Sequence, residues 1–249
     1  MNEPIILPAH CPASHPHPCR PRHLHPWNVT PQEARNIQID LATHVVRHSA
    51  VAEVRRVAGV DVAVGRVGQT GRAGVVVLGY PELAPVEVQN VEAQITFPYI
   101  PGLLSFRELP AVIRAFERLA HCPDLVMVDG QGLAHPRRFG IACHLGVVLD
   151  LPTIGCAKSI LLGRHDPLGD EVGATGLLVD AGEVVGAAVR TRVGSKPLYV
   201  SIGHKVDLDT AVQWVLACCR GHRLPEPTRL AHLAAAGHLS PLPKGEGSP

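Results

Sequence analysis

The sequence predicts an α/β domain built on one central mixed sheet that is flanked by helices. Three valine-rich runs follow one another early in the chain, a short apolar run stands at 125–128, and helical periodicities separate the later runs. Apolar runs bounded by glycine and proline are typical of strands, whereas apolar residues repeating every three or four positions indicate helices. With 249 residues and 46% hydrophobic content, the chain can bury one sizeable core, so we expect a single domain.

The order of these elements is informative. Thr30 and Pro31 are typical of a helix N-cap and first turn, and the first helix is expected to continue to about Ser49. Three consecutive strands, then helix, strand, helix and strand, is the order of the ribonuclease H-like fold. Strands are expected at 56–64, 73–80, 86–96, 125–128, 152–156, 173–179, 183–191 and 197–202. The further helices are expected near 105–119, 139–149, 208–220 and 227–236.

Both ends of the chain are expected to lie outside the folded domain. Residues 1–26 contain seven prolines and five histidines, and alternating His-Pro can form neither a helix nor a strand ladder. We therefore expect a disordered arm over 1–26, a catalytic domain over 27–239 and a second disordered tail over 240–249. The arm also holds Cys11, His15, His17 and Cys19, but their spacing matches no compact zinc module.

Charge and cysteine content limit the functional classes. The net charge is +1, and residues 27–239 carry 20 basic and 20 acidic side chains, which is not the basic footprint of a tight, sequence-independent DNA binder. Clustered arginines such as Arg137 and Arg138, or a bound metal, can supply positive charge locally.

The seven cysteines have irregular spacings, so buried free thiols are favoured over a disulfide framework. No apolar run reaches membrane-spanning length, and we expect a cytoplasmic protein without membrane partners.

Two aspartates follow or interrupt apolar runs. Asp129 stands at the end of the run 125–128, where open α/β sheets place their ligand sites, and Gly130 and Gly132 beyond it allow a ligand to approach the backbone. The structural alternative is that Asp129 caps the next helix. Asp61 lies among valines, and a buried acid is costly there unless it is paired or bound to a metal.

A third acid, Glu108, stands near the start of the helix after the third strand. Ser105 as N-cap with Glu108 three positions later fits a capping box, which is its structural alternative. Acids on a first strand, at a helix start and after a later strand can also converge on a divalent cation. Hard oxygen ligands of this kind favour Mg²⁺ or Mn²⁺.

Five segments give the chain a resemblance to a known family. They are Val60-Asp61-Val62, the run from Phe97 to Glu108 (FPYIPGLLSFRE), the run from Asp129 to Arg137 (DGQGLAHPR), Gly155 to Ser159 (GCAKS) and Leu224 to His232 (LPEPTRLAH). In these segments the chain resembles the endonuclease V family, metal-dependent nucleases that act on deaminated purines, chiefly inosine. The segments run in the family's order and span roughly residues 28 to 238.

The resemblance implies a ribonuclease H-like fold and a catalytic group. In it, Asp61, Glu108 and Asp129 hold Mg²⁺, for which Mn²⁺ can substitute, while Lys158 and His232 complete the catalytic residues. The metal would polarise the phosphate, help to generate hydroxide and stabilise the departing 3′-oxygen. Without the resemblance, Lys158 and His232 have the ordinary interpretation of solvated surface residues.

The segment Pro98-Tyr99-Ile100-Pro101 suggests a second role. Its prolines stiffen a loop and leave two apolar side chains either as protrusions or packed on the core. The resemblance implies that this loop is a wedge that parts the strands, next to a pocket for the extruded base. It implies substrate contacts from Pro98, Tyr99, Ile100, Pro101, Gly102, Leu104, Gly130, His135, Gly140 and Ile141.

Through this resemblance, the sequence predicts a Mg²⁺-dependent DNA-repair endonuclease that recognises inosine in damaged DNA. It is expected to act as a monomer and to cut the second phosphodiester 3′ of the lesion, leaving a 5′-phosphate. One alternative of the same fold acts on inosine-containing RNA or on branched DNA. Another is a ribonuclease H-like ATPase or sugar kinase, for which Gly65–Gly71 is a weak phosphate-binding candidate that lacks a following lysine or helix. A third, a metal-free nucleic-acid-binding module, is disfavoured by the three carboxylates.

Overall fold

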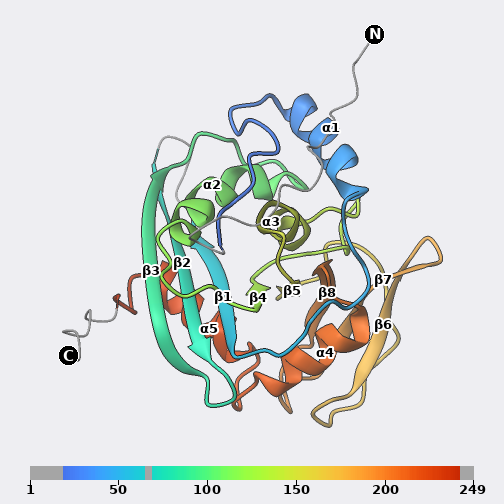
Figure 1. The fold of residues 1–249 in the computed structure, drawn as a ribbon. Helices are drawn as coiled ribbons and strands as arrows, with labels where there is room; N and C mark the ends of the chain where they lie inside the picture. The colour runs from blue at the N-terminus through green and yellow to red at the C-terminus, as the bar shows by residue number, and fades with distance from the viewer. Residues whose placement is uncertain (1–18, 65–68, 242–249) are drawn as a thin grey trace, which may run out of the picture.

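The computed structural model describes residues 19–64 and 69–241. Within this part of the chain the strands are Arg56–Ala63 (β1), Thr70–Gly79 (β2), Ala84–Gln94 (β3), Leu125–Val128 (β4), Thr153–Ala157 (β5), Thr175–Asp180 (β6), Glu183–Val189 (β7) and Leu198–His204 (β8). They form one sheet in the order β3-β2-β1-β4-β5-β8-β7-β6 (Figure 1). Strand β4 pairs in parallel with β1 and β5, and the remaining pairs are antiparallel, which confirms the predicted mixed sheet.

Helices cover both faces of this sheet (Figure 1). They are Pro31–Ala42 (α1), Leu104–Phe116 (α2), Ile141–Leu149 (α3), Leu208–Ala217 (α4) and Glu226–Ala235 (α5). Helices α2 and α3 pack on one face, with α1 against α3, and helices α4 and α5 pack on the other. The order of three strands, helix, strand, helix and strand confirms the ribonuclease H-like fold expected from the sequence.

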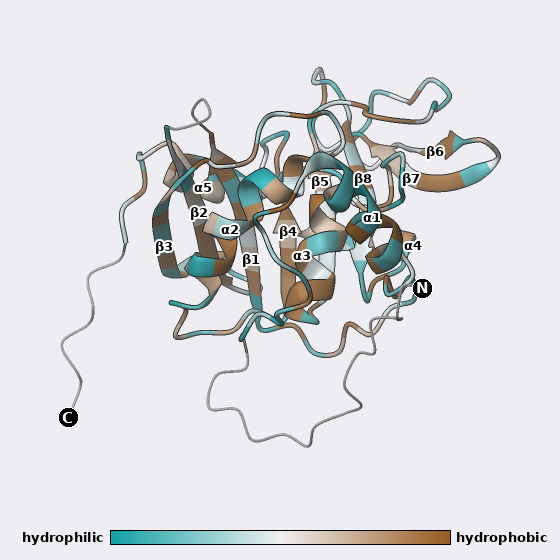
Figure 2. Cartoon of the chain, turned by 90° about the horizontal axis from the view of Figure 1, so that it is seen from above, coloured by the Kyte–Doolittle hydropathy of each residue, from teal (hydrophilic) through white to brown (hydrophobic). Residues whose placement is uncertain are grey.

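The core consists of two apolar layers, one on each side of the sheet. Successive side chains of a strand point to opposite faces, so Val75 and Val77 of β2 join the layer under α2 and α3, while Val76 and Leu78 join the layer under α4 and α5. All four residues of β4 are buried, as is usual for a strand with parallel neighbours on both sides. Figure 2 shows β4 as hydrophobic throughout, whereas edge strand β3 mixes hydrophilic and hydrophobic residues.

Helix α5 lies unusually close to strands β1 and β2. A Cβ atom on Gly59 of β1 would lie 1.8 Å from the carbonyl oxygen of Pro227, and one on Gly74 of β2 would lie 2.5 Å from that of Ala231. Any side chain at these two strand positions would push the helix away from the sheet. The two glycines therefore set the depth at which α5 brings His232 toward β1.

The first helix is shorter than predicted. Helix α1 ends at Ala42 rather than near Ser49. Beyond it the chain pairs with the end of β8: the amide of Lys205 donates to Val46 O (2.7 Å), and the amide of Ala50 donates to Lys205 O (3.0 Å). Val45 and Val46 are β-branched, which lowers helix propensity, and tertiary hydrogen bonds replace the helical ones.

Residues 19–26, which the sequence analysis assigned to the arm, contact the folded domain in the structure. Cys19 forms a disulfide with Cys122, the amide of Arg22 donates to Val148 O (2.8 Å), and His25 packs against Trp27. The prolines prevent this segment from forming a helix or a strand, but its side chains still pack against other residues. Residues 1–18 and 242–249, with Cys11, His15 and His17 of the zinc alternative, lie outside the described residues.

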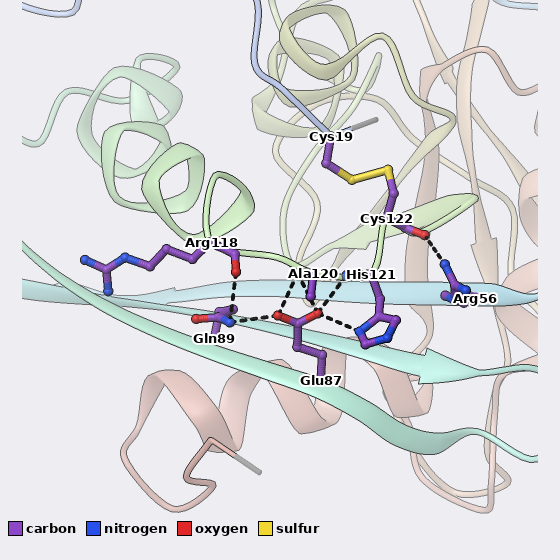
Figure 3. A network of polar contacts seen from close by, with 8 residues as sticks. All are labelled: Cys19, Arg56, Glu87, Gln89, Arg118, Ala120, His121 and Cys122. Atoms are coloured by element: carbon purple, nitrogen blue, oxygen red, sulfur yellow. Dashed lines mark hydrogen bonds and ion pairs between the residues drawn. A yellow bond between two sulfur atoms is a disulfide. The ribbon is translucent and has the colours of Figure 1, made fainter. Parts of the chain in front are cut away.

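A partly buried carboxylate anchors the loop that holds the disulfide (Figure 3). Glu87 of β3 accepts hydrogen bonds from the amides of Ala120 (3.0 Å) and His121 (2.9 Å) and from Nε2 of Gln89 (2.8 Å). These donors favour the charged form, so they lower the pKa of Glu87 although partial burial alone would raise it. Cys122 is thus presented to Cys19 from a fixed loop.

The expectation of free thiols is correct for the other described cysteines. Cys143, Cys156 and Cys218 are buried and Cys219 is half-buried, and none of these four forms a disulfide. Burial raises the pKa of Cys143 to about 12, so this thiol stays protonated. Across residues 19–64 and 69–241, no helix has the length and apolar character needed to cross a membrane.

Candidate active site

Strand register brings the two aspartates together. Val60 of β1 is paired with Val128 of β4, so Asp61, within β1, and Asp129, just after β4, lie side by side where the parallel pairing ends. The amide of Asp129 donates to Val60 O (2.9 Å), which fixes this register. Burial, followed by the nearby charge of Asp61, raises the pKa of Asp129, while Lys158 opposes the shift. The helix-cap alternative for Asp129 is wrong, because the next helix begins at Ile141 with Gly140 as its N-cap.

Glu108 is buried beside these two aspartates rather than serving as a helix cap. Helix α2 begins at Leu104 with Leu103 as its N-cap, and no side chain caps it, so the predicted Ser105–Glu108 capping box is wrong. Burial, then Asp61 and Asp129, raise the pKa of Glu108 to about 8. Asp61, Glu108 and Asp129 are called the acidic cluster below.

Two basic residues face the acidic cluster from different elements. Lys158 follows β5, the parallel neighbour of β4, and its Nζ forms an ion pair with Oδ2 of Asp129. His232 lies on α5, and its Nδ1 is 2.7 Å from Oδ2 of Asp61. Both side chains remain partly exposed, so a substrate can reach them. The structure thus brings together all five residues that the sequence proposed as catalytic.

The acidic cluster suits a divalent cation. One oxygen each of Asp61 and Asp129 and one ring nitrogen of His232 all lie within 4.8 Å of one another. Two carboxylates held this close repel each other, and a hard cation removes that repulsion while using their oxygens as ligands. After burial, the same negative charge of Asp61 and Asp129 contributes to the raised pKa of Glu108.

A cavity of about 380 Å³ opens beside Asp129 and Lys158. Of the ten residues proposed to contact the substrate, nine line it: Tyr99, Ile100, Pro101, Gly102, Leu104, Gly130, His135, Gly140 and Ile141. Pro98 is not among the lining residues. The cavity therefore shares its rim with the acidic cluster.

The segment Pro98–Gly102 is called the wedge loop below, after the role that the resemblance implies, and its last four residues line this cavity. Tyr99 is 70% exposed, so the alternative interpretation, in which its side chain packs on the core, is wrong. Ile100 is half-buried and packs against the buried cluster that contains Leu103 and Phe106, so only one of the two predicted protrusions projects into solvent. A large apolar ring held out from a proline-stiffened loop is suited to contact a partner rather than the core.

Some residues lie near the cavity although no sequence motif predicts that they belong there. Ser105 Oγ lies 2.9 Å from Nδ1 of the buried His144, whose Nε2 lies 2.7 Å from Nε2 of His25. Gln38, from the middle of α1, also lines the cavity and is almost fully buried. These contacts join segments far apart in the sequence, so no local motif could have predicted them.

The arginines that the sequence offered as local positive charge are already engaged. Arg138 forms ion pairs with Asp180 (2.8 Å) and Glu183 (2.7 Å), which join it to the β6–β7 hairpin. Arg137 donates to Gln38 and to Gly102 O. Among the described residues, Lys158 and His232 pair directly with the acidic cluster, and the charge of Arg107 also acts on Glu108.

Comparison with known proteins decides the family. The family model for endonuclease V matches residues 39–233. The chain belongs to the endonuclease V family. It is 58% identical over 214 residues to endonuclease V of Gloeobacter violaceus, covering 84% of this chain and 86% of that protein. Family membership makes the chain an endonuclease, and it removes the ATPase, sugar kinase and metal-free module as alternatives. The phosphate-binding candidate at Gly65–Gly71 falls partly outside the described residues.

Solved structures of the family have the same fold. Endonuclease V of Streptomyces avermitilis superposes with a TM-score of 0.81 at 41% identity, covering 85% of this chain and 93% of that one. Endonuclease V of Ciona intestinalis, in complex with a 24mer DNA containing an inosine followed by a ribo-adenosine, gives a TM-score of 0.72 at 27% identity. That superposition covers 83% of this chain and 96% of the other.

Proposed function

We propose that this endonuclease recognises inosine in damaged DNA and cuts the second phosphodiester 3′ of the lesion. It leaves a 5′-phosphate, acts as a monomer and uses Mg²⁺, for which Mn²⁺ can substitute. The main support is that the acidic cluster and the cavity share a rim: Asp129 and Lys158 line the cavity, and one chain supplies every group. The inosine-containing DNA in the Ciona intestinalis relative supports the same substrate class.

Asp61 and Asp129 would hold the cation, with Glu108 completing its acidic surroundings. Bound there, Mg²⁺ would supply Lewis acidity toward the phosphate and lower the pKa of bound water. Lys158 pairs with Asp129 in the absence of substrate. Its ammonium group is close enough to the acidic cluster to bind a phosphate there through a charge-assisted hydrogen bond.

His232 is oriented for proton transfer. A carboxylate offers only acceptor oxygens, so the hydrogen of the His232 ring lies on Nδ1, facing Asp61. Its Nε2 then carries a lone pair on the exposed side of the ring and can accept a proton from an attacking water.

The cavity is proposed to take the extruded base. Its lining includes Gly102, Gly130 and Gly140, and glycine lets a planar ligand approach the backbone closely. Hypoxanthine differs from adenine by a keto oxygen and an N1 proton, so a site that reads donors and acceptors separates the two bases. Tyr99 would occupy the gap from which the base is removed.

Cleavage with and without a chelator tests this function. A duplex with one inosine is expected to give a single nick at the second phosphodiester 3′ of the lesion. EDTA should abolish the nick, and excess Mg²⁺ or Mn²⁺ should restore it. Parallel substrates with inosine followed by one ribonucleotide, and with inosine in RNA, test the RNA alternative. Equal cutting of unmodified duplex, or cutting that resists EDTA, would contradict the proposal.

Tyr99→Ala should weaken binding to inosine in paired duplex about tenfold more than binding to inosine in a single strand. A wedge acts only where a base stack must be opened, and opening costs a few kcal/mol. Dissociation constants on both substrates, measured in EDTA so that no cutting occurs, provide the test. Equal losses on the two substrates would show that Tyr99 is a simple contact residue.

A further inference from the structure

Gln38 connects two separate walls of the cavity. Its side chain is 1% exposed, and its Nε2 donates to the carbonyl oxygens of Gly102 (3.0 Å) and Phe139 (3.2 Å). Gly102 ends the wedge loop, and Phe139 precedes Gly140 at the start of α3. One amide group from α1 therefore holds together segments that lie 64 and 101 residues further along the chain.

The orientation of this amide is fixed by Arg137. Nε of Arg137 donates to Oε1 of Gln38 (2.6 Å), so the Gln38 oxygen faces the guanidinium and its nitrogen faces the two carbonyl groups. A second guanidinium nitrogen, Nη2, donates to Gly102 O (2.7 Å). Gln38 and Arg137 thus hold the same carbonyl from two directions.

His135 adds a third donor to the Gly102 carbonyl. Its Nδ1 accepts from the amide of Arg137 (3.2 Å), so its Nε2 carries the hydrogen and donates to Gly102 O (3.0 Å). Burial, with Arg137 nearby, lowers the pKa of His135 to about 4, which keeps the ring neutral in this arrangement. Both ring nitrogens are occupied by the protein. We therefore expect His135 to contact a base through ring carbons, not through a hydrogen bond.

The backbone at Gly102 is adapted to this arrangement. Its φ of +78° lies in the left-handed region, and a Cβ atom there would lie 2.8 Å from Arg137 Nη2. A residue other than glycine would be strained in its backbone and would displace a donor. Three donors on one carbonyl hold the wedge loop at a set distance from the start of α3.

We propose that Gln38 is a positioning residue that sets the width of the cavity and thereby separates hypoxanthine from guanine. The inference rests on the proposed function, in which this cavity takes the base. Guanine is hypoxanthine with an added amino group at C2, so the two bases have the same ring size and differ by one substituent. A cavity of fixed width excludes that substituent, whereas a cavity whose walls can separate admits it.

Two substitutions of Gln38 and one control test this role. Gln38→Glu has the same shape and retains an acceptor for Arg137, but it places an oxygen against two carbonyl oxygens. Gln38→Met fills a similar volume and removes both polar functions. Gln32→Met is the control, because Gln32 lies on the same helix and is exposed. Its side chain donates a hydrogen bond to Asn36 of that helix.

The readout is a ratio of kcat/KM values on two substrates. Each is a single-stranded pyrimidine oligonucleotide, with one hypoxanthine or one guanine at the same position, so that unpairing contributes equally. Both Gln38 variants are expected to reduce the preference for hypoxanthine about tenfold, within the range that one small substituent confers on discrimination. The control should retain the preference of the unmodified protein.

The ratio separates positioning from a general loss of structure. A smaller folded fraction lowers cleavage of both substrates alike and leaves the ratio unchanged, so an unchanged ratio in both Gln38 variants would overturn the inference. If the unmodified protein itself shows no preference for hypoxanthine, the proposed function fails instead. A ratio that falls in the Gln32→Met control as well would also overturn the inference, because the effect would then belong to the helix and not to Gln38.

Discussion

Asp129→Asn should reduce cleavage of inosine-containing DNA by a factor on the order of 10³ or more, and Asp61→Asn should do the same. The two carboxylates stand side by side through the pairing of β1 with β4, and each is proposed to bind the cation that activates the phosphate. An amide keeps the shape of the side chain but has no charge, so it binds Mg²⁺ far more weakly. Single-turnover cleavage in saturating Mg²⁺ measures the loss.

The same substitutions should leave the fold intact. Asp61 and Asp129 repel each other in the absence of metal, so neutralising either one removes an unfavourable interaction and should not lower the melting temperature in EDTA. Asp170→Asn is a suitable control, because the Asp170 side chain is 93% exposed and belongs neither to the acidic cluster nor to the cavity lining. Cleavage near the unmodified rate by Asp61→Asn or Asp129→Asn would remove the metal assignment.

Much of this site could be predicted from sequence because it depends on short-range patterns. The apolar run before Asp129 and the glycines after it define a strand end. The valines around Asp61 define a buried strand, and the ribonuclease H-like order makes the two strands parallel neighbours. Parallel strands place their carboxyl ends at one edge of the sheet, so Lys158 after β5 joins the same group.

What the sequence could not predict depends on partners far along the chain. Ser105 and Glu108 have the spacing of a capping box, yet Ser105 bonds to His144, and Glu108 is buried in the acidic cluster. Cys19 is separated by 103 residues from Cys122, so its packing could not be inferred from a proline-rich segment. Gln38 lies in no motif, and its role depends on carbonyl groups of two distant loops.

Glu108→Gln should stabilise the metal-free protein at alkaline pH. Burial and the two aspartates raise the pKa of Glu108 to about 8 in the native state, against an ordinary value of 4.5. Between these pH values the native state retains a proton that the unfolded state has lost, so the free energy of unfolding falls as pH rises. The stabilisation that protonated Glu108 provides is fully present below pH 4.5 and is lost by about pH 8. Over this range the free energy of unfolding falls by at most about 5 kcal/mol.

Glutamine has the same size as protonated glutamate but does not titrate, so the variant should escape this loss. Urea denaturation in EDTA at pH 5, 7 and 9 should give similar free energies of unfolding at pH 5. At pH 9 the variant should be more stable, by about 2 kcal/mol or more. Glu117→Gln is the control, because Glu117 ends the same helix and is exposed. The assignment fails if Glu108→Gln and the unmodified protein lose stability in parallel from pH 5 to pH 9, since Glu108 would then not carry the uncompensated charge of the acidic cluster.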